Sequence, residues 1–293
     1  MAIAIELKPT NILKATILAA VGALCLSLMA LFAKLALAHS TEAIIVFFRF
    51  IIAGLYIFMM LVIAHLRGKH ISLKTKHFGM HMVRNIASVT AMYSLYYALH
   101  YIPLVDANLL MLTYPLFTLV LTAILFKSKV HFSNWAAMAV GFTGIILVLK
   151  PSQALFHPAA LIGLFSGVCA AVAILGIREL SKHEHTYTIM FYNTAAALII
   201  STILVFFDWH TPGWYTLLLL LGVGVAGMLY QELITRALAY APAQIPSSLM
   251  YLSVVFSSIF GLLIWGHMPD YLSWLGIVLV CVGNILVVFS FAA

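Results

Sequence analysis

Charged residues are scarce in this 293-residue chain: Asp, Glu, Lys and Arg make up 8% of it, against 65% hydrophobic residues. A soluble domain carries about 25% charged residues, so the composition excludes an ordinary water-facing surface. About 20 apolar residues suffice to span a bilayer, and uncharged runs of this length exclude outer-membrane barrel strands, which are about ten residues of alternating polarity. The clearest runs are nearly uncharged: Ile12–Ala38, Ala43–Leu66, Leu104–Phe126 and Leu161–Ile177.

The sequence also lacks the motifs of membrane-bound catalysis. It has no HExxH, no GxSxG, no paired aspartates within an apolar run and no nucleotide-binding motif, which argues against an intramembrane hydrolase and against an ATP-driven pump. The three cysteines lie inside apolar runs without CxxC spacing and are interpreted as packing residues. His77 and His81 share a helical face, but no clear third ligand accompanies them. We therefore predict no metal site, no cofactor and no enzymatic activity.

Polar breaks divide the chain into ten apolar spans, joined by loops too short to hold a soluble domain. If the N-terminus is cytoplasmic, twelve Lys and Arg residues fall on or near the inner side, and only Lys34 and Lys150 fall outside. This positive-inside bias predicts an inner-membrane protein with both termini in the cytoplasm, and it accounts for the net charge of +7 without nucleic acid. Lys8 and Lys14 precede the apolar part of the first span, as basic residues precede the apolar core of a signal peptide. The apolar stretch is longer than such a core, so we expect it to be retained.

The two halves of the chain resemble each other. A shift of 139 residues aligns Ala98–Pro103 with Ala237–Pro242 and Trp135 with Trp274, and a shift of 144 aligns Cys25 with Cys169. Because each half holds five spans, the second must enter the membrane upside down, as in many secondary transporters. The sequence therefore predicts an all-α integral membrane protein of ten transmembrane helices, built as two inverted five-helix repeats over residues 1–151 and 152–293.

A few charges are predicted to lie within the membrane, where each costs at least about 2.5–3.5 kcal/mol on insertion scales. Glu232 is the deepest carboxylate. It can couple transport to protons or balance a cationic substrate, or it can form a structural pair with Arg236, one turn later. Arg49 and Arg84 can hold an anionic substrate or bind backbone carbonyls at helix ends, and we interpret them as structural.

Tyrosines and small polar residues mark the expected centre. Helix 4 carries Asn108 and Pro115 on one face, and helix 9 repeats the pattern around Ser247 and Met250. Such patterns suit either a cavity wall or close helix packing in lipid. With Glu232, the predicted substrate-binding set is Tyr93, Tyr97, Asn108, Tyr114, Ser248 and Tyr251.

Several of these segments resemble the EamA-type transporters of the drug/metabolite transporter superfamily. The resemblance rests on Phe47–Phe50, Arg84-Asn85, Tyr97–Leu99, Ala107–Leu110 and Thr113–Phe117. It implies ten helices, termini inside and a central cavity lined mainly by helices 1, 3, 4, 6, 8 and 9. The chain departs from the family after helices 4 and 9, where a Gly-Glu pair is replaced by Lys127-Ser128 and Gly266-His267.

Together these features predict a secondary transporter that moves a small organic metabolite, such as an amino acid or a related solute, by alternating access. Proton coupling and exchange both remain open as driving forces. The expected partners are a small-molecule substrate and membrane lipid, and a homodimer is left open. The alternative is a non-transporting membrane protein, such as a lipid-handling enzyme or an assembly factor, which would need reactive groups within hydrogen-bond reach of one another.

Overall fold

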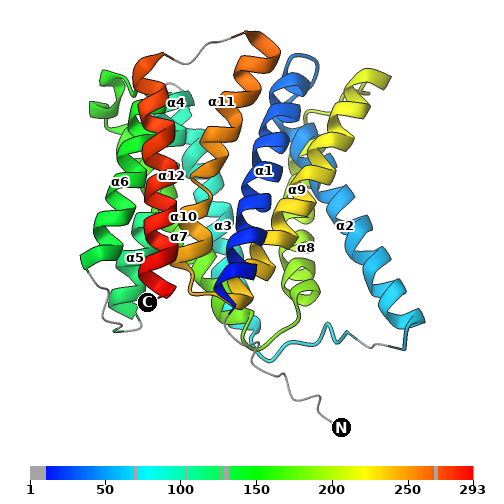
Figure 1. Ribbon diagram of the computed structural model, residues 1–293. Helices are drawn as coiled ribbons and strands as arrows, with labels where there is room; N and C mark the ends of the chain where they lie inside the picture. The colour runs from blue at the N-terminus through cyan, green and yellow to red at the C-terminus, as the bar shows by residue number, and fades with distance from the viewer. Residues whose placement is uncertain are drawn as a thin grey trace.

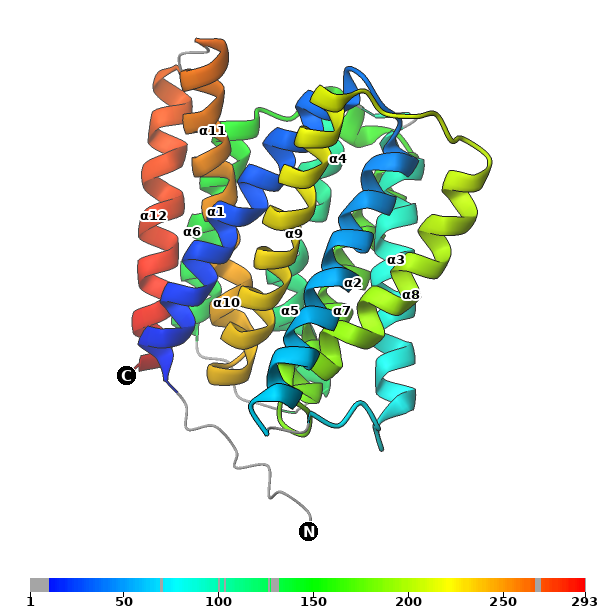
Figure 2. The ribbon, with the colours of Figure 1, turned by 90° about the vertical axis from the view of Figure 1, so that its right-hand side faces the viewer.

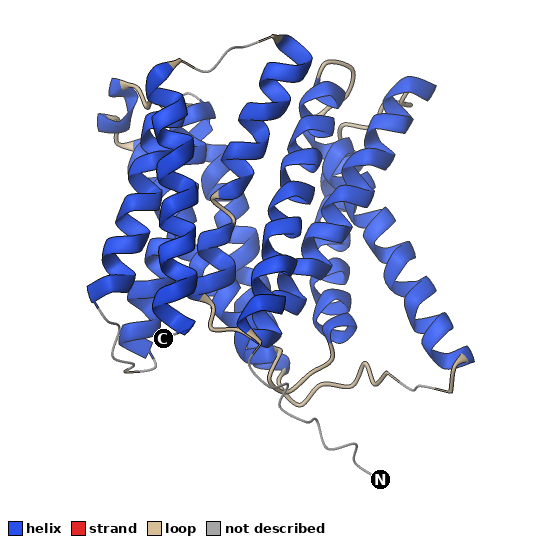
Figure 3. Cartoon of the chain, in the orientation of Figure 1, coloured by secondary structure: helices blue, strands red, loops and turns tan. Residues whose placement is uncertain are grey.

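The computed structural model describes residues 11–68, 71–99, 101–102, 104–125, 127, 132–266 and 270–292, and within them every regular element is a helix (Figure 3). The long helices run roughly parallel or antiparallel to one another (Figure 1). The α-helices are α1 (Ile12–Leu37), α2 (Glu42–Leu66), α3 (Phe78–Leu99), α4 (Leu104–Met111), α5 (Tyr114–Leu125), α6 (Phe132–Leu149), α7 (Ala159–Leu180), α8 (Thr186–Phe206), α9 (Trp214–Tyr240), α10 (Gln244–Leu249), α11 (Leu252–Trp265) and α12 (Tyr271–Ala292). A short 3₁₀ helix, η1 (Gln153–Phe156), precedes α7.

Nine segments of the described chain are long and apolar enough to cross a membrane when α4–α5 and α10–α11 are each taken as one segment. This confirms an all-helical integral membrane protein. Helix α3 is not among the nine because it carries several polar residues. His81, Arg84 and Asn85 are nevertheless buried, and α3 packs chiefly against α7. Protein rather than lipid therefore covers the polar face of α3, and ten spans stay a prediction.

Two membrane segments are interrupted, each nearer its N-terminal end than its C-terminal end. The first breaks between α4 and α5, where Pro115 has no amide hydrogen to bond the carbonyl of Met111 and its ring crowds that carbonyl. The second breaks between α10 and α11. There the hydroxyl of Ser253 donates to the carbonyl of Met250 at 2.7 Å, and such bonds from a side chain to its own helix favour bending.

Helices α6 and α12 cross with their backbones in contact and stand together at one side of the molecule (Figure 1). A Cβ atom on Gly144 would lie 2.5 Å from the carbonyl oxygen of Gly276, and one on Gly283 would lie 2.5 Å from the amide nitrogen of Gly141. Only glycine permits this approach, which brings many atoms of the two helices into van der Waals contact.

The other close pairs are α1 with α9 and α3 with α7. Figure 2 shows α1 and α9 running side by side across the whole height of the molecule. Helix α2 packs against both α8 and α9, whereas α3 and α8 make few contacts with each other. The space between α2, α3 and α8 is where the cavities described below begin.

Helices α5 and α11 precede the two positions at which the chain departs from the family pattern, and both are followed by a residue with positive φ. Lys127 follows α5 with φ of 49°, and Gly266 ends α11 with φ of 66°. Both take the left-handed conformation that often ends a helix, which costs glycine little and strains a residue with a Cβ atom. Ser128 and His267, the second residues of the pairs Lys127-Ser128 and Gly266-His267, lie outside the described residues.

Candidate functional site

A central cavity of about 320 Å³ lies among α1, α2, α3, α5, α7, α8 and α9. Most of its wall is apolar, with a smaller set of polar side chains. Ligand sites in proteins commonly combine an apolar wall with a few converging polar groups. The principal polar lining residues are Arg49, Arg84, Asn85, Tyr114, Asn193 and Gln231.

Arg84 is the most buried cation of this cavity, with 3% of its surface exposed. Its Nη1 donates to Oδ1 of Asn85 at 2.9 Å and also to Oδ1 of Asn193 on α8. Gly176 on α7 makes room for the stem, since a Cβ atom there would lie 2.9 Å from the Cβ of Arg84. The acceptors are neutral amides, so the charge of the guanidinium is not neutralised by them.

Arg49 approaches the cavity from α2. A Cβ atom on Gly227 of α9 would meet Nε of Arg49 at 3.1 Å, so this glycine leaves space for the guanidinium. The guanidinium carbon of Arg49 also lies 5.2 Å from the centroid of the Phe50 ring, which places a cation over an aromatic face. Two guanidinium groups thus line the central cavity, and none of its described lining residues is a carboxylate.

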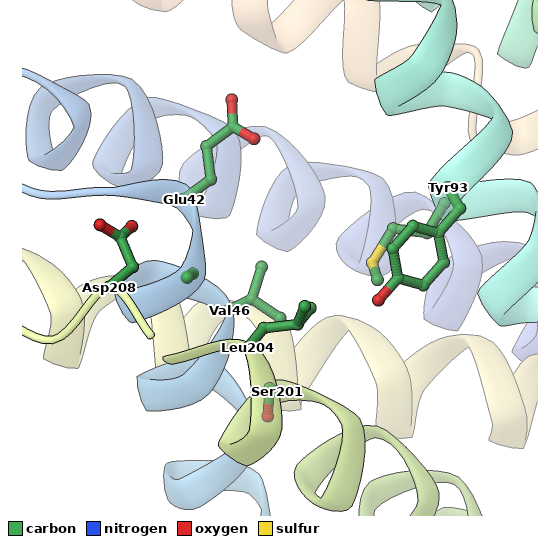
Figure 4. A pocket seen from close by; sticks show the side chains of 8 residues that line it. Glu42, Val46, Tyr93, Ser201, Leu204 and Asp208 are labelled. Carbon is green, nitrogen blue, oxygen red and sulfur yellow. The ribbon is translucent and has the colours of Figure 1, made fainter. Parts of the chain in front are cut away.

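A second cavity, here called the rim cavity, has a volume of about 440 Å³ and lies beside the central one. The two share Val46, Met92, Ser201 and Leu204. Glu42 at the start of α2 and Asp208 after α8 lie at one end of the rim cavity, and Tyr93 lies at the other (Figure 4). The central cavity is therefore approached from the side on which α2 begins and α8 ends.

The opposite end of the helix bundle is closed by polar contacts. The segment before α3 is tied to α8, because Thr188 donates to the carbonyl of Ser72 at 3.0 Å and Tyr192 donates to that of Leu73 at 3.0 Å. Glu184, between α7 and α8, contacts Nε2 of His81 at 2.6 Å. These contacts join α3, α7 and α8 on the side where α1 begins and α12 ends.

Glu232 lies on α9 in the same closed half and does not line either cavity. Its carboxylate accepts hydrogen bonds from Tyr56 on α2 and from Arg236 one turn later, and from Tyr187 on α8 at 3.2 Å. Arg236 also donates to the hydroxyl of Tyr187 at 3.1 Å. The predicted pairing of Glu232 with Arg236 is thus present, and the pair connects α2, α8 and α9.

The other predicted site residues divide between the cavities and the helix interfaces. Tyr114 lines the central cavity and Tyr93 the rim cavity. Tyr97 is half-exposed, with its ring centroid 5.2 Å from that of Tyr101. Asn108 is half-buried in α4 and lines neither cavity.

Ser248 and Tyr251 are buried in packing between helices. Ser248 donates to the carbonyl of Ile245 at 3.0 Å, and the ring centroid of Tyr251 lies 6.5 Å from that of Phe142. A role in binding stays a prediction for all of these residues.

Asn193, Tyr230 and Gln231 line the cavity although the sequence patterns did not single them out. Asn193 could have been identified from the sequence, because the 144-residue shift aligns it with Arg49. No feature of the sequence singled out Gln231. It directly precedes Glu232, and a turn of about 100° per residue decides which of the two faces the cavity.

An apolar helical bundle around a cavity with charged lining residues is the arrangement of an integral membrane protein. Comparison with known proteins agrees: the chain belongs to the EamA-like transporter family, whose model matches residues 13–150 and 157–289. The resemblance seen in the sequence is thereby confirmed.

Curated relatives cover most of the chain. It is 32% identical over 281 residues to the pseudopaline exporter CntI of Pseudomonas aeruginosa strain UCBPP-PA14, covering 94% of this chain and 96% of that one. It is 26% identical to the S-adenosylmethionine uptake transporter of Rickettsia bellii strain RML369-C, covering 86% and 84%. It is 30% identical to the riboflavin transporter of Vibrio cholerae, covering 70% of each. The solutes in these names differ widely, so family membership does not define a substrate.

The fold also matches a solved crystal structure. The two superpose with a TM-score of 0.80 at 16% identity, covering 95% of this chain and 99% of the other. At this identity the likeness shows the fold alone.

Proposed function

We propose that this protein is a secondary transporter that carries a small organic solute by alternating access between two inverted halves. The observation that carries the proposal is the central cavity, which is approached from one end of the bundle and closed by polar contacts at the other. A carrier must bind its solute between two gates of which only one is open. The relatives named as transporters support the same class of function.

The cavity walls support the inverted arrangement. Arg49 and Asn193, at equivalent places of the two halves, both line the central cavity. So do the equivalent pairs Leu26 and Ala170, Met29 and Ala173, Ala91 and Tyr230, Met92 and Gln231, and Leu95 and Ile234. A cavity bounded by matching positions of both halves lies where rocking of one half against the other would alternate its access.

The packing between helices can be compared in the same way, by replacing each helix with its equivalent in the other half. Exchanging the repeats converts the pair α1–α9 into α7–α3, and both pairs are closely packed. The pair α2–α9 becomes α8–α3, yet only the former is closely packed. This difference lies at the entrance to the cavities. We propose that the open conformation places α3 and α8 apart, and that the alternate one parts α2 from α9.

With the N-terminus in the cytoplasm, as the distribution of basic residues predicts, the cavity is open to the outside. Opening toward the cytoplasm would then break the contacts of Glu232 with Tyr56 and Tyr187, which join α9 to α2 and α8. We propose Glu232 and Arg236 as gating residues. The carboxylate of Glu232 would then be the group that couples transport to a proton gradient.

An enzymatic role has less support from the cavity. Its described lining residues include no Asp, Glu, His or Cys, which are the usual general bases and nucleophiles besides an activated serine. The arrangement suits reversible binding of a solute better than bond making or breaking.

The test is transport by purified full-length protein in liposomes loaded with a metabolite mixture, with release followed by mass spectrometry. Ala197 on α8 lines the central cavity, and Ile199 on the same helix is 64% exposed. We expect Ala197→Trp to block release of the solutes that the wild type transports and Ile199→Trp to permit it. Release that is equal with both variants would contradict transport through this cavity, and no release of any solute by the wild type would contradict the proposed function.

A further inference from the structure

We propose that the central cavity recognises a carboxylate group of its solute, held by Arg84 and Arg49 on α2 and α3. This replaces the structural role that the sequence favours for the two arginines, since the acceptors of Arg84 among the described residues are side-chain amides and not backbone carbonyls. This inference rests on the proposed function and names the chemical class of its substrate. The solute would be a small carboxylic acid with a largely apolar body.

The first argument is the uncompensated charge of Arg84. Its side chain lies on α3 among the helices of the bundle, with 3% of the surface of the residue exposed. Within the described chain its hydrogen-bond acceptors are the amide oxygens of Asn85 and Asn193, and no carboxylate is among them. Its Nε atom is buried and has no hydrogen-bond partner among the described residues. A buried charge without an opposite charge is costly, and a bound anion would remove this cost.

The second argument is the distribution of charge around the cavity. Both arginines come from the first half of the chain, while the second half supplies the uncharged Asn193, Tyr230 and Gln231. The positive charge of the cavity therefore lies on α2 and α3, and Arg84 is in contact with the neutral Asn193 of the second half. A solute with one anionic end would bind in one orientation, with that end toward α2 and α3.

The third argument concerns the kind of anion. Guanidinium groups bind planar carboxylates through paired N–H donors. Most of the other lining side chains are apolar, among them Leu26, Met29, Phe50 and Met111. A doubly charged phosphate would lose more hydration on entering such a wall than a singly charged carboxylate. A volume of about 320 Å³ also suits a small molecule with an apolar body.

Asn193 permits a sharp test, because Asn193→Asp places a carboxylate of the same shape against Arg84. We expect this variant to fold and to be at least as heat-stable as the wild type, because it supplies the missing counter-charge. We expect it to bind carboxylates about 10- to 100-fold more weakly, since a charge-assisted hydrogen bond contributes this much. Unchanged carboxylate binding in Asn193→Asp would contradict this role of Arg84.

The measurement is the thermal shift of the purified full-length protein with amino acids, keto acids, dicarboxylates and aryl carboxylates, each beside its carboxamide and its phosphonate analogue. We expect carboxylates to stabilise the wild type and the carboxamides not to do so. Arg49→Gln should weaken the shift as Asn193→Asp does, and serves if the latter does not fold. Lys34→Gln, which removes an exposed charge of α1, is the control and should bind normally.

Three results would overturn the inference: stabilisation by carboxamides as strong as by carboxylates, stabilisation by phosphonates alone, or no stabilisation by any carboxylate. The same variants in the liposome assay separate the two proposals. Transport of neutral or cationic solutes that carboxylates do not inhibit would refute carboxylate recognition and leave the transporter function standing. Absence of all transport would refute the function itself.

Discussion

Nη1 of Arg84 on α3 donates a hydrogen bond to Oδ1 of Asn193 on α8, so a buried cation of the first half is bound by a neutral amide of the second. Asn193 occupies the place in its half that Arg49 has in the first. The halves thus supply different chemistry at equivalent positions. The proposed inverted arrangement would keep its symmetry for conformational change while the site stays asymmetric for recognition.

Glu232 and Arg236 should be coupled in stability. We expect Glu232→Gln to lower the free energy of unfolding by about 1–3 kcal/mol, because it leaves Arg236 without its charged acceptor and weakens the bonds from Tyr56 and Tyr187. Arg236→Gln in the same chain should restore much of the loss. Thermal unfolding of both single variants and the double variant measures this, and strictly additive effects would refute a coupled pair.

The same carboxylate should matter for energy coupling. In liposomes, Glu232→Gln should abolish accumulation driven by a pH gradient and spare exchange of solute for solute, because exchange moves no net proton. Exchange by the same preparation controls for misfolding. Gradient-driven accumulation at the wild-type rate would remove the proton-coupling hypothesis and leave exchange or facilitated diffusion as the mechanism.

Lys127→Gly should stabilise the protein. Lys127 is exposed and has φ of 49°, a conformation that glycine adopts at lower cost. We expect a gain of about 0.5–1 kcal/mol, seen as a higher melting temperature in detergent. Gly266→Ala, at the equivalent position, should lose a similar amount because it puts a Cβ atom at φ of 66°. A melting temperature lowered by Lys127→Gly would show that the lysine side chain outweighs the backbone strain.

Gly144→Ala should separate α6 from α12. The added methyl group would lie 2.5 Å from the carbonyl oxygen of Gly276 and 2.7 Å from the amide nitrogen of Val280, and neither backbone atom can move without shifting a helix. We expect a loss of about 1–3 kcal/mol in thermal unfolding. Gly261→Ala is the matched control: nothing lies within 4 Å of its added Cβ, so its effect should be neutral or favourable.

Lys150 and Asp270 form an ion pair with 2.5 Å between Nζ and Oδ2, joining the end of α6 to the start of α12. The hydrogen bond from Lys150 is the main cause that lowers the pKa of Asp270 to about 2, and bonds from Ser273 add to it. The pair therefore stabilises the fold above the pKa of the unfolded carboxyl, near 4, and this contribution is lost as the pH falls toward 2.

Asp270→Asn measures that contribution, because the amide keeps an oxygen for the hydrogen bonds from Ser273 and loses the charge. The difference in melting temperature from the wild type should be small, since both side chains are about half exposed. It should shrink between pH 4 and pH 2 and in high salt. A difference that is constant over this range would show that the charge contributes nothing.

Hydrophobicity alone determined the class of fold. Uncharged runs of membrane length leave the backbone no water to bond, so they must form helices that satisfy it internally. The matching segments of the two halves showed the duplication. The interruption of the fourth segment was not predicted, although Pro115 is a local signal for it because proline breaks the hydrogen bonding of a helix. These features depend on local composition and on neighbours along the chain, so they can be read from it directly.

Only the tertiary structure decided which polar residues share a cavity. Glu232 and Gln231 are adjacent in sequence, yet Gln231 lines the cavity while Glu232 bonds to Tyr56, Tyr187 and Arg236 away from it. Arg84 becomes a cavity residue because Gly176 lets α7 approach α3. Which face of a helix meets which neighbour depends on packing between segments far apart in the chain, and in a nearly uniform apolar sequence no periodic pattern reveals it.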